Sequence, residues 1–99
     1  MDMKVQTIHF DADKKLLDYV DEKVSKLKNY TDDIVATEVI LKLNNNSELD
    51  NKITEILLYM PGKDLFVKKQ SKSFEDATDQ AVEALTVQIK KQKEKMRGI

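Results

Sequence analysis

The sequence lacks several residue types on which whole classes of function depend. None of its 99 residues is a cysteine, which excludes disulfides, thiolate metal sites and cysteine nucleophiles. Gly62 and Gly98 are the only glycines, so a glycine-rich phosphate-binding loop cannot be built. No apolar run approaches the ~18 to 20 residues that span a bilayer, and the N-terminus lacks the basic-then-apolar order of a signal peptide. We therefore expect a cytoplasmic protein that does not act at a membrane.

Residues suited to catalysis or metal binding are equally scarce. His9 is the single histidine, and a lone histidine at a strand end is usually a packed or hydrogen-bonded structural residue. Asp11 and Asp13 resemble a carboxylate pair, but helix capping explains them better. The serines lie far from His9 in the sequence, so a serine nucleophile has no visible general base. We expect no catalytic residue, no metal, no cofactor and no small-molecule substrate.

Charge is abundant and unevenly distributed. The net charge of −1 and the pI near 5.8, taken alone, argue against a nucleic-acid-binding protein. However, segments 23–28, 63–72 and 88–97 together hold 12 of the 17 basic residues and only two of the 18 acidic residues. The sequence is strongly dipolar, and an anionic partner would be attracted if the three basic segments meet in space.

The first half of the chain predicts a strand and then an amphipathic helix. Residues 3–10 alternate apolar and polar side chains, which is typical of a strand. From Asp13 to about Tyr30, apolar residues recur at helical spacing: Leu16, Leu17, Val20, Val24 and Leu27. At 100° per residue, Lys23 and Lys26 lie on one flank of this stripe and Lys28 on the other.

The second half predicts three strands and another helix. Strands are expected at 35–43, 52–60 and 65–70, with a turn at Pro61-Gly62 before the last one. Ser73 caps a second helix, whose apolar side includes Ala81, Leu85 and Ile89. A helical crossover favours parallel pairing of the first two strands, and short connections favour antiparallel pairing of the others. We predict an α+β domain over residues 1–99, β-α-β-β-β-α, with both helices on one face of a four-stranded mixed sheet.

The most polarised feature is the end of the second helix, residues 89–97. Such a charge run is ordinarily a solvated helix end. Lys91 and Lys95, however, are one turn apart and project from the same flank, an arrangement that can span phosphates. Lys68 and Lys69 are weaker candidates, because strand alternation sends them to opposite faces. The aromatic residues are too scattered for base stacking, so any RNA contact should be to backbone and shape.

Several segments of the chain resemble a known family. Residues 8–20, 23–28, 65–77, 81–85 and 88–91 are similar to the short ribosome hibernation-promoting factors, the sigma-54 modulation or ribosomal subunit interface family. The resemblance covers essentially the whole chain and includes the element order derived above. It implies an architecture similar to that of double-stranded-RNA-binding domains. The additional C-terminal dimerisation domain of the long family form is expected to be absent, leaving a basic tail from about residue 96.

The resemblance also implies a function and a set of RNA-binding residues. Members of this family bind small-subunit ribosomal RNA in the channel that messenger and transfer RNA use. The resemblance therefore implies that the partner is the small ribosomal subunit and its rRNA, and that the protein blocks translation by steric occlusion. The resemblance places the RNA-binding positions at Lys23, Lys26, Lys68, Lys69, Lys90, Lys91 and Lys95. Lys28 and Lys93, in the same basic segments, are expected to bind RNA as well. Thr86-Val87 stand where many relatives have arginine.

Two other functions fit the residues considered alone. One is a stand-alone domain that binds structured RNA without a ribosomal role, and the other is a protein-interaction module that uses the open face of the sheet. RNA binding requires the basic segments to converge, so Lys23 or Lys26 should share a surface with Lys91 and Lys95.

Overall fold

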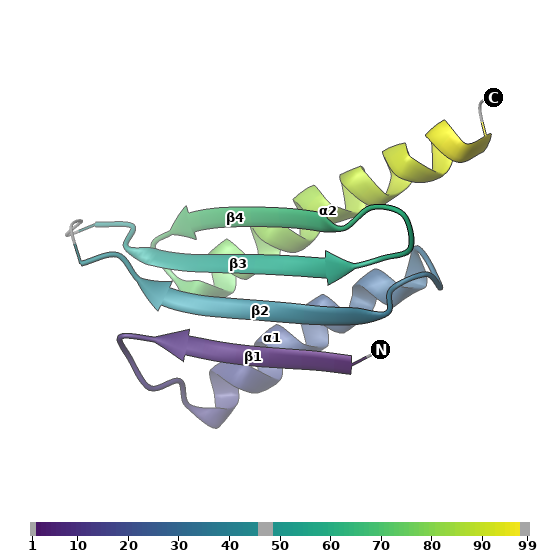
Figure 1. Cartoon of the computed structure of the whole chain (residues 1–99). Coiled ribbons are helices and arrows are strands. Elements are labelled where there is room, and N and C mark those ends of the chain that lie inside the picture. Colours follow the sequence, from purple (N-terminus) through teal and green to yellow (C-terminus); the bar gives the residue numbers. More distant parts are fainter. Residues whose placement is uncertain (1, 46–48, 98–99) are drawn as a thin grey trace.

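Both helices lie on the same face of a four-stranded sheet in the computed structural model, which describes residues 2–45 and 49–97, with side chains to residue 94 (Figure 1). The elements are β1 (Asp2–Ile8), α1 (Lys14–Ser25), a 3-10 helix η1 (Lys26–Asn29), β2 (Ala36–Leu43), β3 (Lys52–Tyr59), β4 (Leu65–Ser71) and α2 (Phe74–Arg97). This order confirms the predicted β-α-β-β-β-α arrangement.

The strands lie side by side in the order β1-β2-β3-β4, so β1 and β4 form the two edges of the sheet. β1 runs parallel to β2, with Val5 opposite Val39, because α1 carries the chain back across the sheet between them. The β2–β3 and β3–β4 pairs are antiparallel, and Ile56 lies opposite Val67. The predicted mixed pairing is therefore confirmed.

The hydrophobic core lies between the sheet and the helices. Every second residue of the central strands points into it, including Val39 and Leu41 of β2 and Ile56 and Leu58 of β3. The helices contribute these buried side chains: Val20 and Val24 from α1, Leu27 from η1, and Ala81, Leu85 and Ile89 from α2. Leu16, expected in this group, is only partly buried at the margin of the core. Within residues 2–45 and 49–97, no helix or strand covers the opposite face of the sheet (Figure 1).

The helix ends show how side chains fix the elements. The Asp13 carboxylate accepts a hydrogen bond from the Leu16 amide at 2.8 Å, and the Ser73 hydroxyl accepts one from the Asp76 amide at 3.0 Å. Both predicted caps are thus confirmed. The first helix does not continue as an α-helix to Tyr30 but tightens into η1 at Lys26. Such 3-10 turns are frequent at helix C-termini, where the last carbonyls lack helical partners.

None of the helices in the described ranges is both long enough and apolar enough to cross a membrane.

Candidate RNA-binding surface

A hollow of about 450 Å³ lies between α1 with η1 on one side and α2 on the other. It is called the interhelical hollow below, and it is lined by Lys23, Lys26, Tyr30, Asp79, Val82, Glu83, Thr86, Val87 and Lys90. Three lysines from two segments of the chain thus share one concave surface with two carboxylates. The basic segments 23–28 and 88–97 meet here through Lys23, Lys26 and Lys90, but segment 63–72 contributes no residue to this hollow.

Lys23 is held in place by residues of both helices. Its ammonium lies 5.5 Å from the centroid of the Tyr19 ring and 3.8 Å from Asp79 Oδ1. The Tyr19 hydroxyl donates hydrogen bonds to Asp79 Oδ1 at 2.8 Å and Oδ2 at 2.9 Å. This hydrogen bonding, together with the smaller effect of partial desolvation of the phenol, raises the pKa of Tyr19 to about 12. Asp79 therefore orients Lys23 and also offsets its charge.

Lys90 lies at the opposite end of the hollow, beside Tyr30. Its ammonium lies 5.5 Å from the centroid of the Tyr30 ring, a cation–π distance. Tyr30 follows η1 directly and is 38% exposed, so its ring is available as a platform at the surface. An adjoining hollow of about 330 Å³ is lined by Tyr30, Lys90, Lys93 and Glu94. The basic surface thus continues along α2 toward Lys93.

Lys91 lies on the other flank of α2. It lines a separate hollow of about 250 Å³ with Lys63, Leu65, Gln88 and Gln92, beside the turn that precedes β4. Lys90, rather than the predicted Lys91, therefore shares the interhelical hollow with Lys23 and Lys26. Successive helical residues differ by about 100° in direction, and the buried Leu85 and Ile89 fix α2 so that position 90 turns toward α1.

The remaining candidate lysines are dispersed. Lys28 is exposed on η1. Lys68 and Lys69 point to opposite faces of β4, as expected: Lys69 lies beside Gln80 and Glu83 of α2, and Lys68 is on the open face of the sheet. The side chain of Lys95 lies outside the described part of the structure, so its expected place beside Lys91 stays a prediction.

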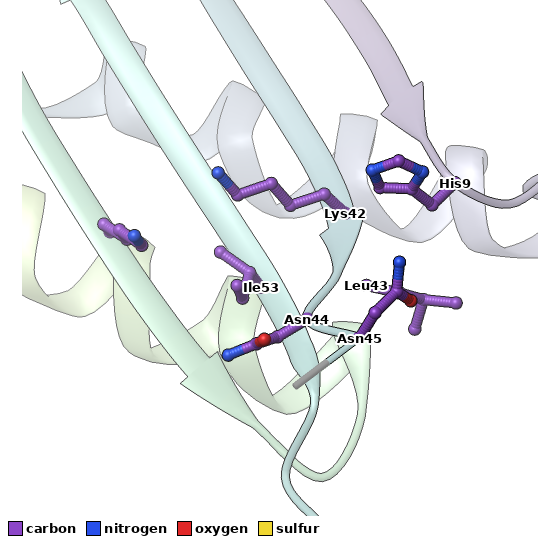
Figure 2. Close-up of a pocket in the computed structure, with 7 residues that line it drawn as sticks. His9, Lys42, Leu43, Asn44, Asn45 and Ile53 are labelled. Atoms are coloured by element: carbon purple, nitrogen blue, oxygen red, sulfur yellow. The ribbon is translucent and has the colours of Figure 1, made fainter. Parts of the chain in front are cut away.

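His9 differs from its expected structural role. It is exposed rather than packed, and its backbone φ of 70° lies in the left-handed region. It lines a fourth hollow, on the open face of the sheet, with Lys42 and Lys68 among the other lining residues (Figure 2). No sequence pattern indicated this hollow, because four separate segments form it. Within residues 2–45 and 49–97, no group of three or more histidine, aspartate or glutamate side chains is placed to hold a metal ion.

Thr86 and Val87, the positions at which many relatives have arginine, lie in the wall of the interhelical hollow. The Thr86 hydroxyl donates a hydrogen bond to the Val82 carbonyl at 2.9 Å, so it is engaged within α2. Val87 is 47% exposed and places an apolar side chain among the lysines. The centre of the hollow is therefore less basic than its two ends.

The chemistry of this surface is that of anion binding. Lysine ammonium groups bind phosphate oxygens as point charges, and three of them border this concave surface. The aromatic rings of Tyr19 and Tyr30 lie against lysine ammonium groups. The surface is thus suited to contacts with backbone and shape rather than to reading base edges.

The fold and sequence comparisons give the class of protein and then its family. Two helices on one face of a four-stranded mixed sheet, in the order β-α-β-β-β-α, is the fold of ribosomal subunit interface proteins. One from Coxiella burnetii superimposes with a TM-score of 0.84 at 19% identity, over 94% of this chain and 98% of the other. The chain belongs to the Sigma 54 modulation protein / S30EA ribosomal protein family, whose sequence profile matches residues 3–97.

Individual relatives agree with this assignment. The ribosome hibernation promoting factor of Pseudomonas putida is 28% identical over 99 residues, which are 100% of this chain and 93% of that protein. The N-terminal domain of Thermus thermophilus Protein Y is 26% identical and superimposes with a TM-score of 0.78, covering 92% of this chain and 98% of that domain. The family resemblance predicted from the sequence is thereby confirmed.

Replacing Asp79 with asparagine tests how the interhelical hollow is charged. Asp79→Asn removes a negative charge that faces Lys23, so RNA binding should tighten about 1.5- to 5-fold, the value of an exposed ion pair. The salt dependence of binding should also become steeper, because Lys23 can then contact a phosphate of the RNA instead of Asp79. Asp21→Asn, an exposed acidic residue of α1 outside the hollow, is the matched control. Unchanged binding by Asp79→Asn would show that Lys23 does not contact RNA.

The same variant should change the titration of Tyr19. Loss of the carboxylate acceptor should lower the pKa of Tyr19 from about 12 toward the ordinary value of about 10, as followed by phenolate absorbance. Because the folded-state pKa is raised, the Tyr19–Asp79 bond stabilises the wild-type fold fully below about pH 10, and this stabilisation is lost as pH rises toward 12. The stability of Asp79→Asn should therefore depend less on pH in that window.

Proposed function

We propose that this protein is a ribosome hibernation factor that binds ribosomal RNA of the small subunit, in the channel used by messenger and transfer RNA. The observation that carries the proposal is the meeting of Lys23, Lys26 and Lys90 in one hollow between two helices. The names of its relatives, a ribosome hibernation promoting factor and a ribosomal subunit interface protein, support the ribosome as partner. The protein would act in the cytoplasm, where ribosomes work.

The proposed mechanism needs no catalytic step. The lysines of the interhelical hollow neutralise phosphates of the RNA backbone, and release of the counterions of that RNA drives binding. The folded body then occupies volume that messenger and transfer RNA require, so translation stops by steric competition. Lys28, Lys68, Lys69, Lys91, Lys93 and Lys95 would add contacts around the periphery, according to how the RNA curves about the domain.

Ribosome sedimentation tests the proposal directly. The purified protein is mixed with small subunits, large subunits or free duplex RNA, and its distribution after centrifugation is measured at several salt concentrations. Binding to small subunits, with log affinity falling steeply as log salt rises, and inhibition of a translation extract at the same concentrations are expected. Equal binding to any duplex RNA, without inhibition, would support a stand-alone RNA-binding domain instead.

One observation favours the alternative of a protein-interaction module. Phe66 is 52% exposed on the open face of the sheet, and it lies opposite the partly exposed Leu57 of β3. An apolar interface built on this face would change little with salt, because no phosphates are neutralised. Salt-insensitive binding that is lost in Phe66→Ser and retained in Lys26→Gln would favour this alternative over RNA binding.

Restoring the family's positive charge in the hollow should strengthen binding. Val87→Arg places a guanidinium, which can contact a phosphate with two hydrogen bonds, between Lys23 and Lys90. We expect tighter binding to small subunits and a slope of log affinity against log salt steeper by roughly 0.9. Val35→Arg makes the same change at a position that is 63% exposed and lies outside the hollow. Equal effects of the two variants would mean that only net charge matters.

A further inference from the structure

The hollow on the open face of the sheet is a surface feature that the proposed function does not use beyond Lys68. It has a volume of about 460 Å³ and is lined by His9, Lys42, Leu43, Asn44, Asn45, Ile53 and Lys68 (Figure 2). We call it the sheet-face hollow. Its residues come from the chain just beyond β1, the end of β2 and the chain that follows it, the start of β3 and the middle of β4. The sheet register brings these segments together, with Ile8 opposite Lys42 and Lys42 opposite Ile53.

The sheet-face hollow opens away from the helices. The strand neighbours Leu41 and Val67 are buried beneath the helices, so Lys42 and Lys68 project from the other side of the sheet. The interhelical hollow lies on the helix side. The protein therefore carries basic residues in hollows on two opposite faces.

One acidic side chain adjoins these basic groups. Glu55 of β3 is 15% exposed in its side chain, and its Oε2 lies 2.9 Å from Lys42 Nζ, which fixes that lysine toward β3. Lys68 lies opposite Glu55 across the β3–β4 pair, but it forms no ion pair within the described ranges. Because Glu55 is satisfied by Lys42, Lys68 and His9 remain as exposed cationic or hydrogen-bonding groups at the rim.

The backbone of His9 also points to a binding role. Its φ of 70° is uncommon for a residue other than glycine, although histidine, asparagine and aspartate tolerate it better than most. This left-handed turn ends β1 and brings the imidazole to the rim, where Figure 2 shows it facing the same space as the Asn45 side chain. Residues held in such sparsely populated conformations concentrate at ligand sites.

We propose that the sheet-face hollow binds a phosphate group, with Lys68, His9 and Asn45 as its donors beside the Lys42–Glu55 ion pair in its wall. The group can come from a phosphodiester of the bound RNA or from free inorganic phosphate. The first source rests on the proposed function and gives the protein RNA contacts on two opposite faces. A domain held in this way is wedged between two RNA segments rather than attached to one wall of a channel.

Two single variants test the donors without disturbing the fold. Lys68→Gln removes an exposed charge, and His9→Asn keeps a residue that tolerates the left-handed backbone while removing the imidazole. Lys42 is left unchanged, because its removal would leave the largely buried Glu55 carboxylate without its partner. Lys4→Gln is the control, since Lys4 is exposed on β1 and lies outside the sheet-face hollow. Circular dichroism verifies that all three variants are folded.

The first measurement follows the ¹H–¹⁵N signals of the His9 ring and the Asn45 side chain during titration with inorganic phosphate, against chloride at equal ionic strength. The second measures binding to small subunits as a function of salt. For an RNA phosphodiester, we expect Lys68→Gln and His9→Asn to bind on the order of tenfold more weakly at low salt. We also expect the salt slope of Lys68→Gln to be shallower by roughly 0.9, and Lys4→Gln to match the wild type.

The two measurements distinguish an RNA phosphodiester from free phosphate as the ligand. They also test this site separately from the proposed function. Saturable phosphate shifts with unchanged ribosome binding would assign the site to free phosphate, whereas weakened ribosome binding assigns it to RNA. If neither phosphate shifts nor weakened binding occur, the anion site is overturned. Failure of the wild-type protein to bind small subunits would instead contradict the proposed function, and the phosphate titration would still test the sheet-face hollow by itself.

Discussion

Replacing Lys26 and Lys90 together with glutamate should abolish binding to the small subunit while leaving the fold intact. The two substitutions change the interhelical hollow from three lysines and two carboxylates to one lysine and four carboxylates. Loss of two phosphate contacts should make the salt slope shallower by roughly 1.8 and weaken binding on the order of 100-fold or more. Ribosome sedimentation across a salt series and inhibition of a translation extract measure both effects.

The fold should tolerate this double substitution because both side chains are exposed and lysine and glutamate are similar helix formers. Reversal at Lys26, near the C-terminal end of α1, should cost about 0.3 to 1 kcal/mol through the helix dipole. Lys4→Glu with Lys15→Glu makes an equal change of charge at exposed positions outside the hollow. A folded Lys26→Glu, Lys90→Glu protein that still sediments with small subunits would contradict the proposed binding surface.

A single substitution at Lys91 extends this test to the other flank of α2. Lys91 lines the hollow beside the turn before β4, not the interhelical hollow. We expect Lys91→Glu to weaken binding less than Lys90→Glu, because Lys90 acts together with Lys23 and Lys26. A larger effect at Lys91 would indicate that the main RNA contact lies near the start of β4 rather than in the interhelical hollow.

Truncation of Leu85 should cause the largest loss of stability. Leu85 is fully buried in the core between α2 and the sheet, so Leu85→Ala removes apolar contacts and leaves a cavity. The expected cost is about 2 to 5 kcal/mol, which corresponds to a fall in Tm of about 4 to 8 °C per kcal/mol for a domain of this size. Urea denaturation followed by circular dichroism measures it.

Val87 provides a control for that experiment on the same helix. It is 47% exposed, so Val87→Ala should change the free energy of unfolding by less than about 0.5 kcal/mol. If Leu85→Ala unfolds at the same urea concentration as Val87→Ala, the packing of α2 described here is wrong.

The fold could be predicted from the sequence because each element carries a strong local signal. Alternating side chains mark the strands, Asp13 and Ser73 mark the helix starts, and connection lengths decide between parallel and antiparallel pairing. The change from α1 to η1 at Lys26 has no comparable signal, because the apolar stripe continues through Leu27 in either helix type. Local sequence patterns therefore predicted the helices, the strands and the strand pairing more accurately than the residue at which α1 ends.

The candidate surface was harder to predict than the fold. The apolar side of α2 was predicted correctly, since Ala81, Leu85 and Ile89 are buried. The sequence does not show which flank of α2 faces α1, and that flank holds Lys90 rather than Lys91. The sheet-face hollow could not be predicted at all, since it depends on the left-handed backbone of His9 and on the register of four strands.

The open edges of the sheet have a consequence for solubility. In the part of the chain that the structure describes, β1 and β4 each pair on one side only, and an unpaired strand edge can associate with the same edge of another molecule. Charged side chains, lysine above all, disfavour such association. β1 carries Lys4, and β4 carries Lys68 and Lys69. The lysine pair of β4 therefore also protects the protein against aggregation, and its neutralisation should promote insoluble β-sheet assemblies even where RNA is absent.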